Sequence, residues 1–311
     1  MQDHPRNQRK ADGGLTVPKP LHIVGRFAPS PTGPLHFGSL VAATASYLAA
    51  RQAKGEWLLR IEDIDKPREQ PGAADRIIRT LNAYGFEWDR EILYQSHRLH
   101  AYHEAISRLH QHTYACACSR KDLLMHGRMG AFGIIYPGSC RHKPSTHLPQ
   151  QHSIRLRTHN DPICFTDRIQ GEYCQRLESE VGDFVILRAD GLFAYQLAVV
   201  VDDAFQGVNQ IVRGADLLDN TPRQIWLQHL LGFPQPDYAH APLVLNELGQ
   251  KLSKQNLAPA IGSQDCLQQL VASLHFLKQP CPDSSEFSNL TELWGWAIAH
   301  WDMTKISKAQ T

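Results

Sequence analysis

The stretch LHIVGRFAPSPTGPLHFGS, residues 21–39, decides the fold. Residues 21–28 alternate enough to form a strand, and the prolines and glycine of 29–34 then exclude regular structure. Residues 35–53 are rich in Ala and Leu, as in a helix packed against a sheet. A loop between a first strand and a first helix faces the usual ligand crevice of an open α/β sheet, with free helix N–H groups pointing at it.

The rest of the chain extends this pattern. We expect strands at 57–61, 210–213 and 241–245, and helices at 74–84, 98–112, 194–205 and 221–231. Between 114 and 187 Gly and Pro become frequent and short β-like runs appear at 153–157 and 163–167. Strands that alternate with helices predict a parallel sheet of βαβ units, here split by an inserted domain. The predicted parts are a mobile leader (1–20), two halves of a nucleotide-binding domain (21–113 and 188–245), the insertion (114–187) and a C-terminal unit (246–311).

Composition limits the possible partners. The 311 residues carry 32 basic and 31 acidic side chains, so bulk charge does not predict a nucleic-acid-binding protein, and an RNA would be held locally. The sequence has no apolar run of about 18 residues, and residues 1–20 are polar. We expect a soluble cytoplasmic protein with no membrane contact and no obligate protein partner. Its seven cysteines, an odd number without a secretory signal, make a disulfide framework unlikely and point to metal binding.

Two segments could bind a nucleotide. His36 could stabilise phosphoryl oxygens, and Gly38 would let the nucleotide approach the backbone, although capping and turn roles are commoner for His-x-Gly. Lys251 and Lys254 lie in a polar loop after the last predicted strand and could close over a triphosphate, although such lysines alone are usually solvated surface.

Together these segments resemble the HIGH motif (36–39) and the KMSKS motif (251–255) of class I aminoacyl-tRNA synthetases. RFAPSPTG at 26–33, RIEDID at 60–65 and VVVDD at 199–203 are similar to the glutamyl branch, and the resemblance covers about residues 22–258. It implies a Rossmann-like parallel sheet, ATP contacts from His36, Gly38, Ser39 and Lys254, and catalytic roles for His36, Gly38, Lys251 and Lys254. Ser39 replaces the second histidine of the motif and removes one candidate phosphate donor, whereas Lys254 keeps the expected cation.

Glutamate carries one ammonium and two carboxylates, so its site needs an anionic and a cationic anchor. The resemblance implies that Glu62 takes the ammonium, that arginines and a tyrosine surround the carboxylates, and that the first loop adds contacts. A guanidinium matches a carboxylate and would leave the amide of glutamine without its ion pair. Each of these residues also has an ordinary structural alternative. Arg26 or Arg213 could be a surface charge, Glu62 a salt-bridged helix neighbour and Tyr195 a core aromatic. The implied glutamate-binding residues are Arg26, Phe27, Ala28, Pro29, Ser30, Glu62, Tyr195 and Arg213.

The insertion contains a candidate metal site. Cys116 and Cys118 precede Tyr136 and Cys140 by about twenty residues, and three thiolates with one oxygen could enclose zinc. From spacing alone, two reduced cysteines on a strand are an equal alternative, and His126 and His142 are rival fourth ligands. Similarity to short glutamyl-synthetase paralogues implies one structural Zn²⁺ on Cys116, Cys118, Tyr136 and Cys140, since four protein ligands leave no open position.

Roughly the last 55 residues follow the KMSKS-like segment, which is too few for an anticodon-binding domain. A synthetase-like chain shortened in this way resembles the glutamyl-queuosine tRNA(Asp) synthetase family. The resemblance implies that L-glutamate is activated with ATP, with Mg²⁺ bound to the nucleotide, and passed to queuosine in the anticodon loop of tRNA(Asp). Three alternatives are a minimal glutamyl-tRNA synthetase that charges a tRNA 3′ end, an inactive RNA-binding module, and an enzyme that glutamylates a small molecule or protein.

Overall fold

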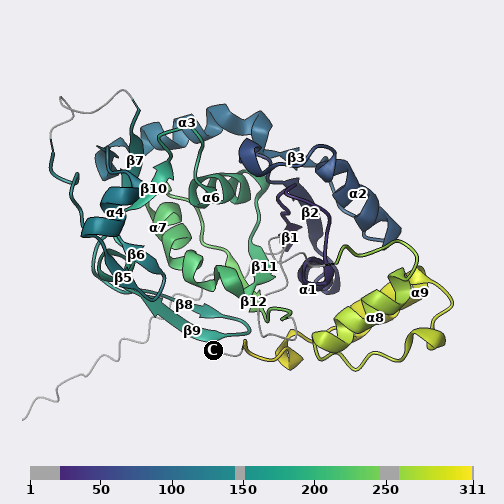
Figure 1. The fold of residues 1–311 in the computed structure, drawn as a ribbon. Coiled ribbons are helices and arrows are strands. Elements are labelled where there is room, and N and C mark those ends of the chain that lie inside the picture. The colour runs from purple at the N-terminus through teal and green to yellow at the C-terminus, as the bar shows by residue number, and fades with distance from the viewer. Residues whose placement is uncertain (1–21, 144–150, 246–258, 310–311) are drawn as a thin grey trace, which may run out of the picture.

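The computed structural model describes residues 22–143, 151–245 and 259–309. Its centre is a parallel arrangement in which β2 (Glu56–Ile61) pairs with β1 (Val24–Phe27) on one side and β3 (Leu93–Tyr94) on the other. A second parallel pair joins β11 (Gln210–Gly214) to β12 (Asp237–Ala241). The carbonyl of Val24 accepts a hydrogen bond of 3.1 Å from the N–H of Asn209, which brings β11 alongside β1. The β11–β12 pair therefore lies beside β1 (Figure 1).

The predicted α/β architecture with parallel strands is confirmed. The prediction misplaced the last strand of the sheet. It put this strand at 241–245, whereas β12 spans Asp237–Ala241. Pro242 follows immediately and has no N–H to donate to a ladder, which accounts for the end of the strand there.

Helices cover both faces of the sheet. The helix predicted at 98–112 ends at Arg108 and continues as a 3₁₀ turn over His110–His112. The helices of the nucleotide-binding part are α1 (Phe37–Gln52), α2 (Ala73–Ala83), α3 (Leu99–Arg108), α6 (Tyr195–Gln206) and α7 (Thr221–Leu231). Further 3₁₀ turns span Lys66–Arg68, Gln95–Arg98, Ala215–Asn220, Ser284–Glu286 and Met303–Lys305.

The segment after α3 forms small antiparallel sheets. β7 pairs with β4 and β10, β5 pairs with β6, and β8 pairs with β9. Leu156 and Phe184 belong to the same buried cluster as Leu197 of α6 and Leu227 of α7, so the segment shares a core with the second half of the sheet. Its elements are β4 (Thr113–Cys116), α4 (Arg120–His126), β5 (Arg128–Gly130), β6 (Gly133–Ile135), β7 (Ser153–Leu156), β8 (Ile163–Asp167), β9 (Gly171–Gln175), α5 (Leu177–Glu180) and β10 (Phe184–Leu187).

One disulfide joins two of the seven cysteines. Cys164 of β8 and Cys174 of β9 are direct cross-strand partners, and their sulfurs are bonded at 2.01 Å. The cysteine count made a disulfide framework unlikely, yet this one disulfide is present, because the hairpin register sets the two side chains opposite each other. The other five are free thiols.

The C-terminal helices α8 (Cys266–Phe276) and α9 (Leu290–His300) lie beside α1 (Figure 1). Trp294 of α9 contacts Tyr47 of α1 with ring centroids 4.8 Å apart, and both belong to the largest buried cluster. No helix among the described residues is long and apolar enough to cross a membrane.

Candidate active site

A cavity of about 320 Å³ opens at the carboxyl ends of the parallel strands. Every glutamate-binding residue that the resemblance implies lines it, together with three of the implied nucleotide-binding residues. These are Arg26, Phe27, Ala28, Pro29, Ser30, Glu62, Tyr195 and Arg213, with His36, Gly38 and Ser39. Lys251 and Lys254 lie outside the described residues. The structure thus brings the first loop, the end of β2, the start of α6 and the end of β11 to one place.

His36 and Ser39 cap the N-terminus of α1. The Nδ1 of His36 accepts the N–H of Ser39 at 3.3 Å, and the hydroxyl of Ser39 accepts the N–H of His36 at 3.5 Å. This reciprocal capping box satisfies two backbone donors at the helix start. The capping role weighed for the His-x-Gly sequence is therefore present, at a helix end that also lines the cavity.

The segment that follows the KMSKS-like residues returns to the same loop. Ala260 forms an antiparallel bridge with His36, and the N–H of Ile261 donates to the carbonyl of Leu35 at 3.0 Å. On the other side, Leu243 and Val244 line the cavity. One described flank of residues 246–258 therefore lines the cavity, and the other is paired with the loop that contains His36.

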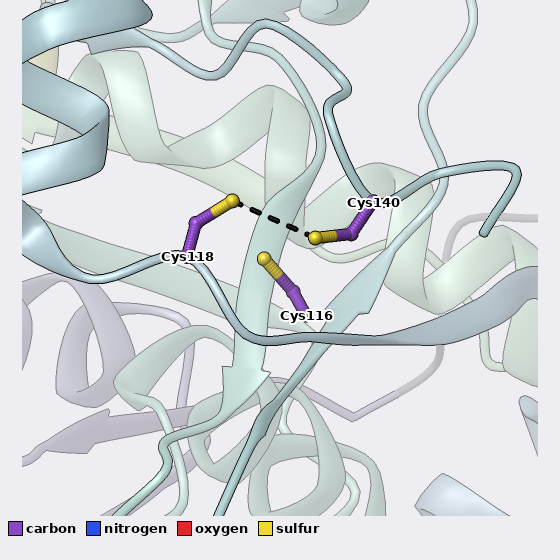
Figure 2. Close-up of side chains that lie close together, drawn as sticks. All are labelled: Cys116, Cys118 and Cys140. Carbon is purple, nitrogen blue, oxygen red and sulfur yellow. Dashed lines mark hydrogen bonds between the residues drawn. The ribbon is translucent and has the colours of Figure 1, made fainter. Parts of the chain in front are cut away.

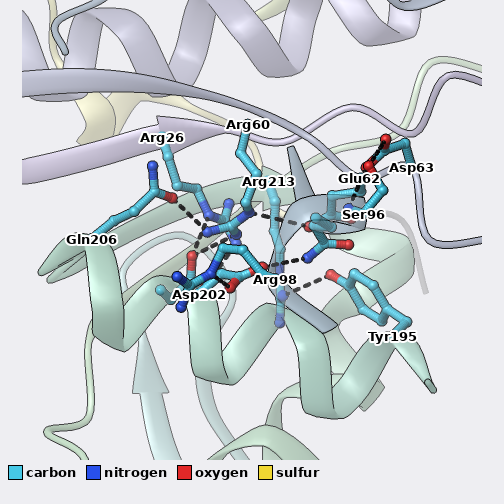
Figure 3. A network of polar contacts seen from close by, with 12 residues as sticks. Arg26, Arg60, Glu62, Asp63, Ser96, Arg98, Tyr195, Asp202, Gln206 and Arg213 are labelled. Carbon is cyan, nitrogen blue, oxygen red and sulfur yellow. Dashed lines mark hydrogen bonds and ion pairs between the residues drawn. The ribbon is translucent and has the colours of Figure 1, made fainter. Parts of the chain in front are cut away.

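A buried charge network supports one side of the cavity (Figure 3). Arg26 donates from Nε and Nη2 to the two carboxylate oxygens of Asp203, at 3.2 and 3.4 Å. Arg60 donates to Asp203 at 2.6 Å and to Gln206 at 2.8 Å. Burial raises the pKa of Asp203, but the charges of Arg26 and Arg60 outweigh it and hold that pKa below its ordinary value. Asp203 therefore remains an anion and fixes two guanidinium groups.

Glu62 is the anionic group of the cavity, and its side chain is 7% exposed. No hydrogen-bond donor among the described residues reaches its Oε1, and the nearest cation, Nε of Arg60, is 3.6 Å away. Burial raises the pKa of Glu62 to about 7, against the opposing charges of Arg60 and Arg26. A buried carboxylate oxygen without a donor is costly unless a ligand cation pairs with it.

Arg213 is the second guanidinium of the cavity. Its Nη1 donates to the hydroxyl of Tyr195 at 3.3 Å and its Nη2 to the hydroxyl of Thr221 at 2.9 Å. Its Nε donates to the Nε2 of His240 at 3.0 Å. Figure 3 shows Tyr195 and Arg213 joined by this contact, at the side of the network where Glu62 also lies.

The sequence alone assigned no role to Arg60, Asp203 and His240, which hold the cavity-lining arginines in place. Arg60 and Asp203 fall in the segments that resemble the glutamyl branch, and two acidic residues ending an apolar helix could have flagged Asp203. His240, flanked by alanines in a buried strand, gives no such signal.

The three cysteines of the candidate metal site face one another (Figure 2). The sulfurs of Cys116, Cys118 and Cys140 lie within 4.8 Å of one another, and no histidine or carboxylate among the described residues completes the group at that distance. The hydroxyl of Tyr136 lies 3.4 Å from the sulfur of Cys116 and 4.0 Å from that of Cys118. Three thiols that converge in this way could bind a metal ion.

A family model described as tRNA synthetases class I (E and Q), catalytic domain, matches residues 22–269. The chain belongs to this family. It is therefore a ligase with a class I synthetase catalytic domain. All the residues that line the cavity, from Arg26 to Val244, fall inside the matched region.

Curated relatives cover nearly the whole chain. Glutamyl-Q tRNA(Asp) synthetase from Dechloromonas aromatica is 54% identical over 291 residues, which cover 91% of this chain and 95% of the relative. Proteins of the same name from Neisseria meningitidis and Chromobacterium violaceum are 53% and 52% identical, over 91% of this chain and 97% and 94% of their own.

Solved structures confirm the fold. A glutamate tRNA ligase from Elizabethkingia meningosepticum, in complex with its amino acid, aligns with a TM-score of 0.75 at 24% identity. The alignment covers 93% of this chain and 66% of that one. This likeness supports a class I synthetase fold with parallel strands.

Proposed function

We propose that the protein activates L-glutamate with ATP and transfers it to queuosine in the anticodon loop of tRNA(Asp). The observation that carries the glutamate part is one cavity that combines the buried Glu62 with the guanidinium groups of Arg26 and Arg213. The choice of acceptor rests on the relatives named glutamyl-Q tRNA(Asp) synthetase, at 51–54% identity over about nine tenths of the chain.

The binding mode follows from the charges of the wall. The ammonium of glutamate pairs with Glu62, whose Oε1 has no donor among the described residues. Its carboxylates meet Arg26 and Arg213, and the hydroxyl of Tyr195 donates to the carboxylate held by Arg213. Glutamine would present an amide to a guanidinium and lose the charge-assisted bond.

The first reaction step joins glutamate to the nucleotide. An oxygen of the α-carboxylate attacks the α-phosphorus of ATP, the bond to the oxygen that bridges to the β-phosphorus breaks, and pyrophosphate leaves. The N-terminus of α1, where His36, Gly38 and Ser39 line the cavity, faces the phosphates with the positive end of the helix dipole. Lys251 and Lys254 neutralise the leaving pyrophosphate, and Mg²⁺ accompanies ATP.

The second step transfers the glutamyl group. A hydroxyl of the queuosine cyclopentene ring attacks the carbonyl carbon of glutamyl-adenylate, AMP leaves with the bonding electron pair, and the hydroxyl proton is lost to solvent. The product is an ester.

The proposed domains follow the order of the chain. Residues 21–113 and 188–245 would form the catalytic domain, and residues 114–187 would form an insertion. Residues 246–311 would form a loop and a helical unit that contacts RNA, and residues 1–20 a leader, in a protein of the cytoplasm.

The cysteine cluster would hold one structural Zn²⁺. The ligands we propose are Cys116, Cys118, Cys140 and Tyr136, whose hydroxyl also accepts the N–H of Cys140 at 2.8 Å. Bound zinc would cross-link β4 to the segment after β6 and would leave no open position for a substrate.

The test is transfer of labelled glutamate to tRNA from cells with and without queuosine, before and after periodate oxidation of the 3′ end. The proposal expects labelling that requires queuosine and withstands a blocked 3′ end. Because periodate also cleaves the cis-diol of the queuosine ring, the expected survival of labelling is measured on tRNA whose 3′ end is blocked by removal of the terminal adenosine, whereas periodate should abolish labelling of either acceptor. Labelling that ignores queuosine and needs an intact 3′ end would show a minimal glutamyl-tRNA synthetase instead.

A matched pair of variants tests the glutamate site. Arg213→Ala is expected to raise the KM for glutamate in ATP–pyrophosphate exchange by about 100-fold, because an ion-paired hydrogen bond is lost. Arg188→Ala, which removes an exposed guanidinium paired with Asp190, should leave the exchange unchanged. An unchanged KM in Arg213→Ala would overturn the carboxylate assignment.

A further inference from the structure

A line of three buried side chains runs from the β8–β9 hairpin into the cavity. Asp167 ends β8, His240 lies in β12, and Arg213 lies beside it in β11. The Nδ1 of His240 lies 2.6 Å from Oδ2 of Asp167, and its Nε2 lies 3.0 Å from Nε of Arg213. Their exposed fractions are 2%, 0% and 5%, so water does not compete for these contacts.

The hydrogens along this line can be assigned from chemistry. The Nε of Arg213 always carries its hydrogen, so the Nε2 of His240 must accept and cannot carry one. The hydrogen of the neutral ring is therefore on Nδ1, where the carboxylate of Asp167 accepts it. Burial and the charge of Arg213 lower the pKa of His240 to about 4, although Asp167 opposes this, so the ring is neutral at pH 7.

Asp167 is itself held in one orientation. Its Oδ1 accepts the backbone N–H groups of Ile169, Gln170 and His240, at 3.0, 2.8 and 3.1 Å. Only Oδ2 then faces the imidazole. Burial raises the pKa of Asp167, but these hydrogen bonds and that of His240 outweigh it and keep the pKa below its ordinary value.

The contacts of Arg213 leave a defined set of donors for a ligand. Of its five N–H groups, one goes to His240, two lie toward Thr221 and the carbonyl of Leu217, and one goes to Tyr195. By this count the second N–H of Nη1 remains for the cavity, next to the hydroxyl of Tyr195. The direction of that N–H depends on how the guanidinium plane is held at Nε.

We propose that Asp167 and His240 are positioning residues, which fix the plane of the Arg213 guanidinium so that Nη1 and the Tyr195 hydroxyl meet one carboxylate of the substrate together. The inference rests on the proposed glutamate site and deepens it. It makes Asp167, at the end of β8, part of the substrate-recognition machinery.

Asp167→Asn is the decisive variant, because it changes hydrogen positions with little change in shape. The amide oxygen takes over the three backbone N–H groups, so the amide nitrogen faces the imidazole and donates to Nδ1. The ring hydrogen then moves to Nε2 and points at the N–H of Arg213, donor against donor. We expect the KM for glutamate to rise at least about tenfold, with the KM for ATP unchanged.

Gln170→Ala is the matched control in the same turn. Gln170 donates to the carbonyl of His240 at 2.6 Å and so ties the hairpin to β12 without touching the imidazole. If the hairpin matters only as packing, Gln170→Ala and Asp167→Asn should raise the KM alike, and that result would overturn the proposal. We expect only Asp167→Asn to raise the KM for glutamate.

Two further measurements separate the possible failures. In ¹⁵N-histidine spectra of the wild-type protein, His240 should be the Nδ1–H tautomer, and an Nε2–H tautomer would refute the proposal without any variant. In an Arg213→Ala background, Asp167→Asn should add no further increase in KM. If Arg213→Ala raises the KM but Asp167→Asn does not, the positioning role fails and the glutamate site stands; if neither does, the site assignment itself fails.

Discussion

Asp203 binds Arg26 side-on, with its two carboxylate oxygens 3.2 and 3.4 Å from Nε and Nη2 of the guanidinium. This contact uses one edge of Arg26 and leaves Nη1 for the cavity that Arg26 lines. Because Arg60 donates to the same carboxylate at 2.6 Å, one anion orients two buried cations. The exposed fractions are 3% for Arg26, 0% for Arg60 and 3% for Asp203.

Asp203→Asn should therefore damage both stability and activity. Breaking a buried ion pair leaves an uncompensated charge, and we expect the free energy of unfolding to fall by about 3 kcal/mol. The KM for glutamate should rise as Arg26 loses its orientation. Urea unfolding and pyrophosphate exchange measure the two effects. The control is Asp65→Asn, which removes a partner of the exposed Arg68 and should change stability by less than about 1 kcal/mol; equal effects of the two variants would refute the argument.

The pKa of Glu62 predicts how glutamate affinity depends on pH. Burial raises this pKa to about 7, and the ammonium of glutamate pairs only with the carboxylate form. Below pH 7 the empty site holds a proton that binding must release, so affinity falls as the pH falls, while above pH 7 it levels off. We expect glutamate to bind about tenfold more weakly at pH 6 than at pH 8 by titration calorimetry.

Glutarate is the control ligand, because it has both carboxylates and no ammonium. Its affinity should not weaken between pH 8 and pH 6, since protonation of Glu62 removes a repulsion. An affinity for glutamate that stays constant over this range would show that Glu62 does not pair with the ammonium.

Local patterns predicted much of the fold and the inner wall of the cavity. Prolines and glycine after β1, and the apolar run of α1, mark a loop at a sheet edge, and the family resemblance supplies Arg26, Glu62 and Arg213. The Asp167–His240–Arg213 line could not be read in this way, because its contacts join residues 73 and 27 positions apart. Nothing near His240 in sequence indicates that an insertion hairpin reaches it.

The disulfide was missed for the same physical reason. Cys164 and Cys174 are ten residues apart, and they face each other only in the one hairpin register that pairs them. A shift of one residue would send the two side chains to opposite faces. The cysteine count alone carries no information about that register.

The metal site predicts a graded response to substitution. We expect the purified protein to hold one zinc ion per chain by atomic emission, and Cys116→Ser with Cys118→Ser to abolish it, because two thiolates are lost. Tyr136→Phe should keep zinc but bind it more weakly, since only the hydroxyl near the three sulfurs is removed.

His126→Ala and His142→Ala are the controls for the fourth ligand. Both histidines are exposed, and the ring of His126 contacts the carbonyl of Asp122 at 3.0 Å. Neither substitution should change zinc affinity in a competition assay with a chelator. Loss of zinc from His126→Ala, with full retention in Tyr136→Phe, would replace Tyr136 by His126 as the ligand.

Ser39 gives a prediction about the departure from the HIGH motif. Its hydroxyl accepts the N–H of His36, and its own N–H is accepted by the His36 ring, so the pair closes the first turn of α1. Ser39→Ala removes one half of this capping box and should lower the free energy of unfolding by about 1 kcal/mol. Ser39→Thr keeps a hydroxyl and should lower the free energy of unfolding by less.

The KM for ATP tests whether Ser39 also contacts the nucleotide. If it does, Ser39→Ala will raise the KM for ATP while Ser39→Thr will not. If Ser39 serves the helix alone, both variants will keep the wild-type KM and differ only in stability. We expect the second result, because the hydroxyl is already engaged by the backbone of His36, and a tenfold rise in the KM for ATP in Ser39→Ala alone would reverse that assignment.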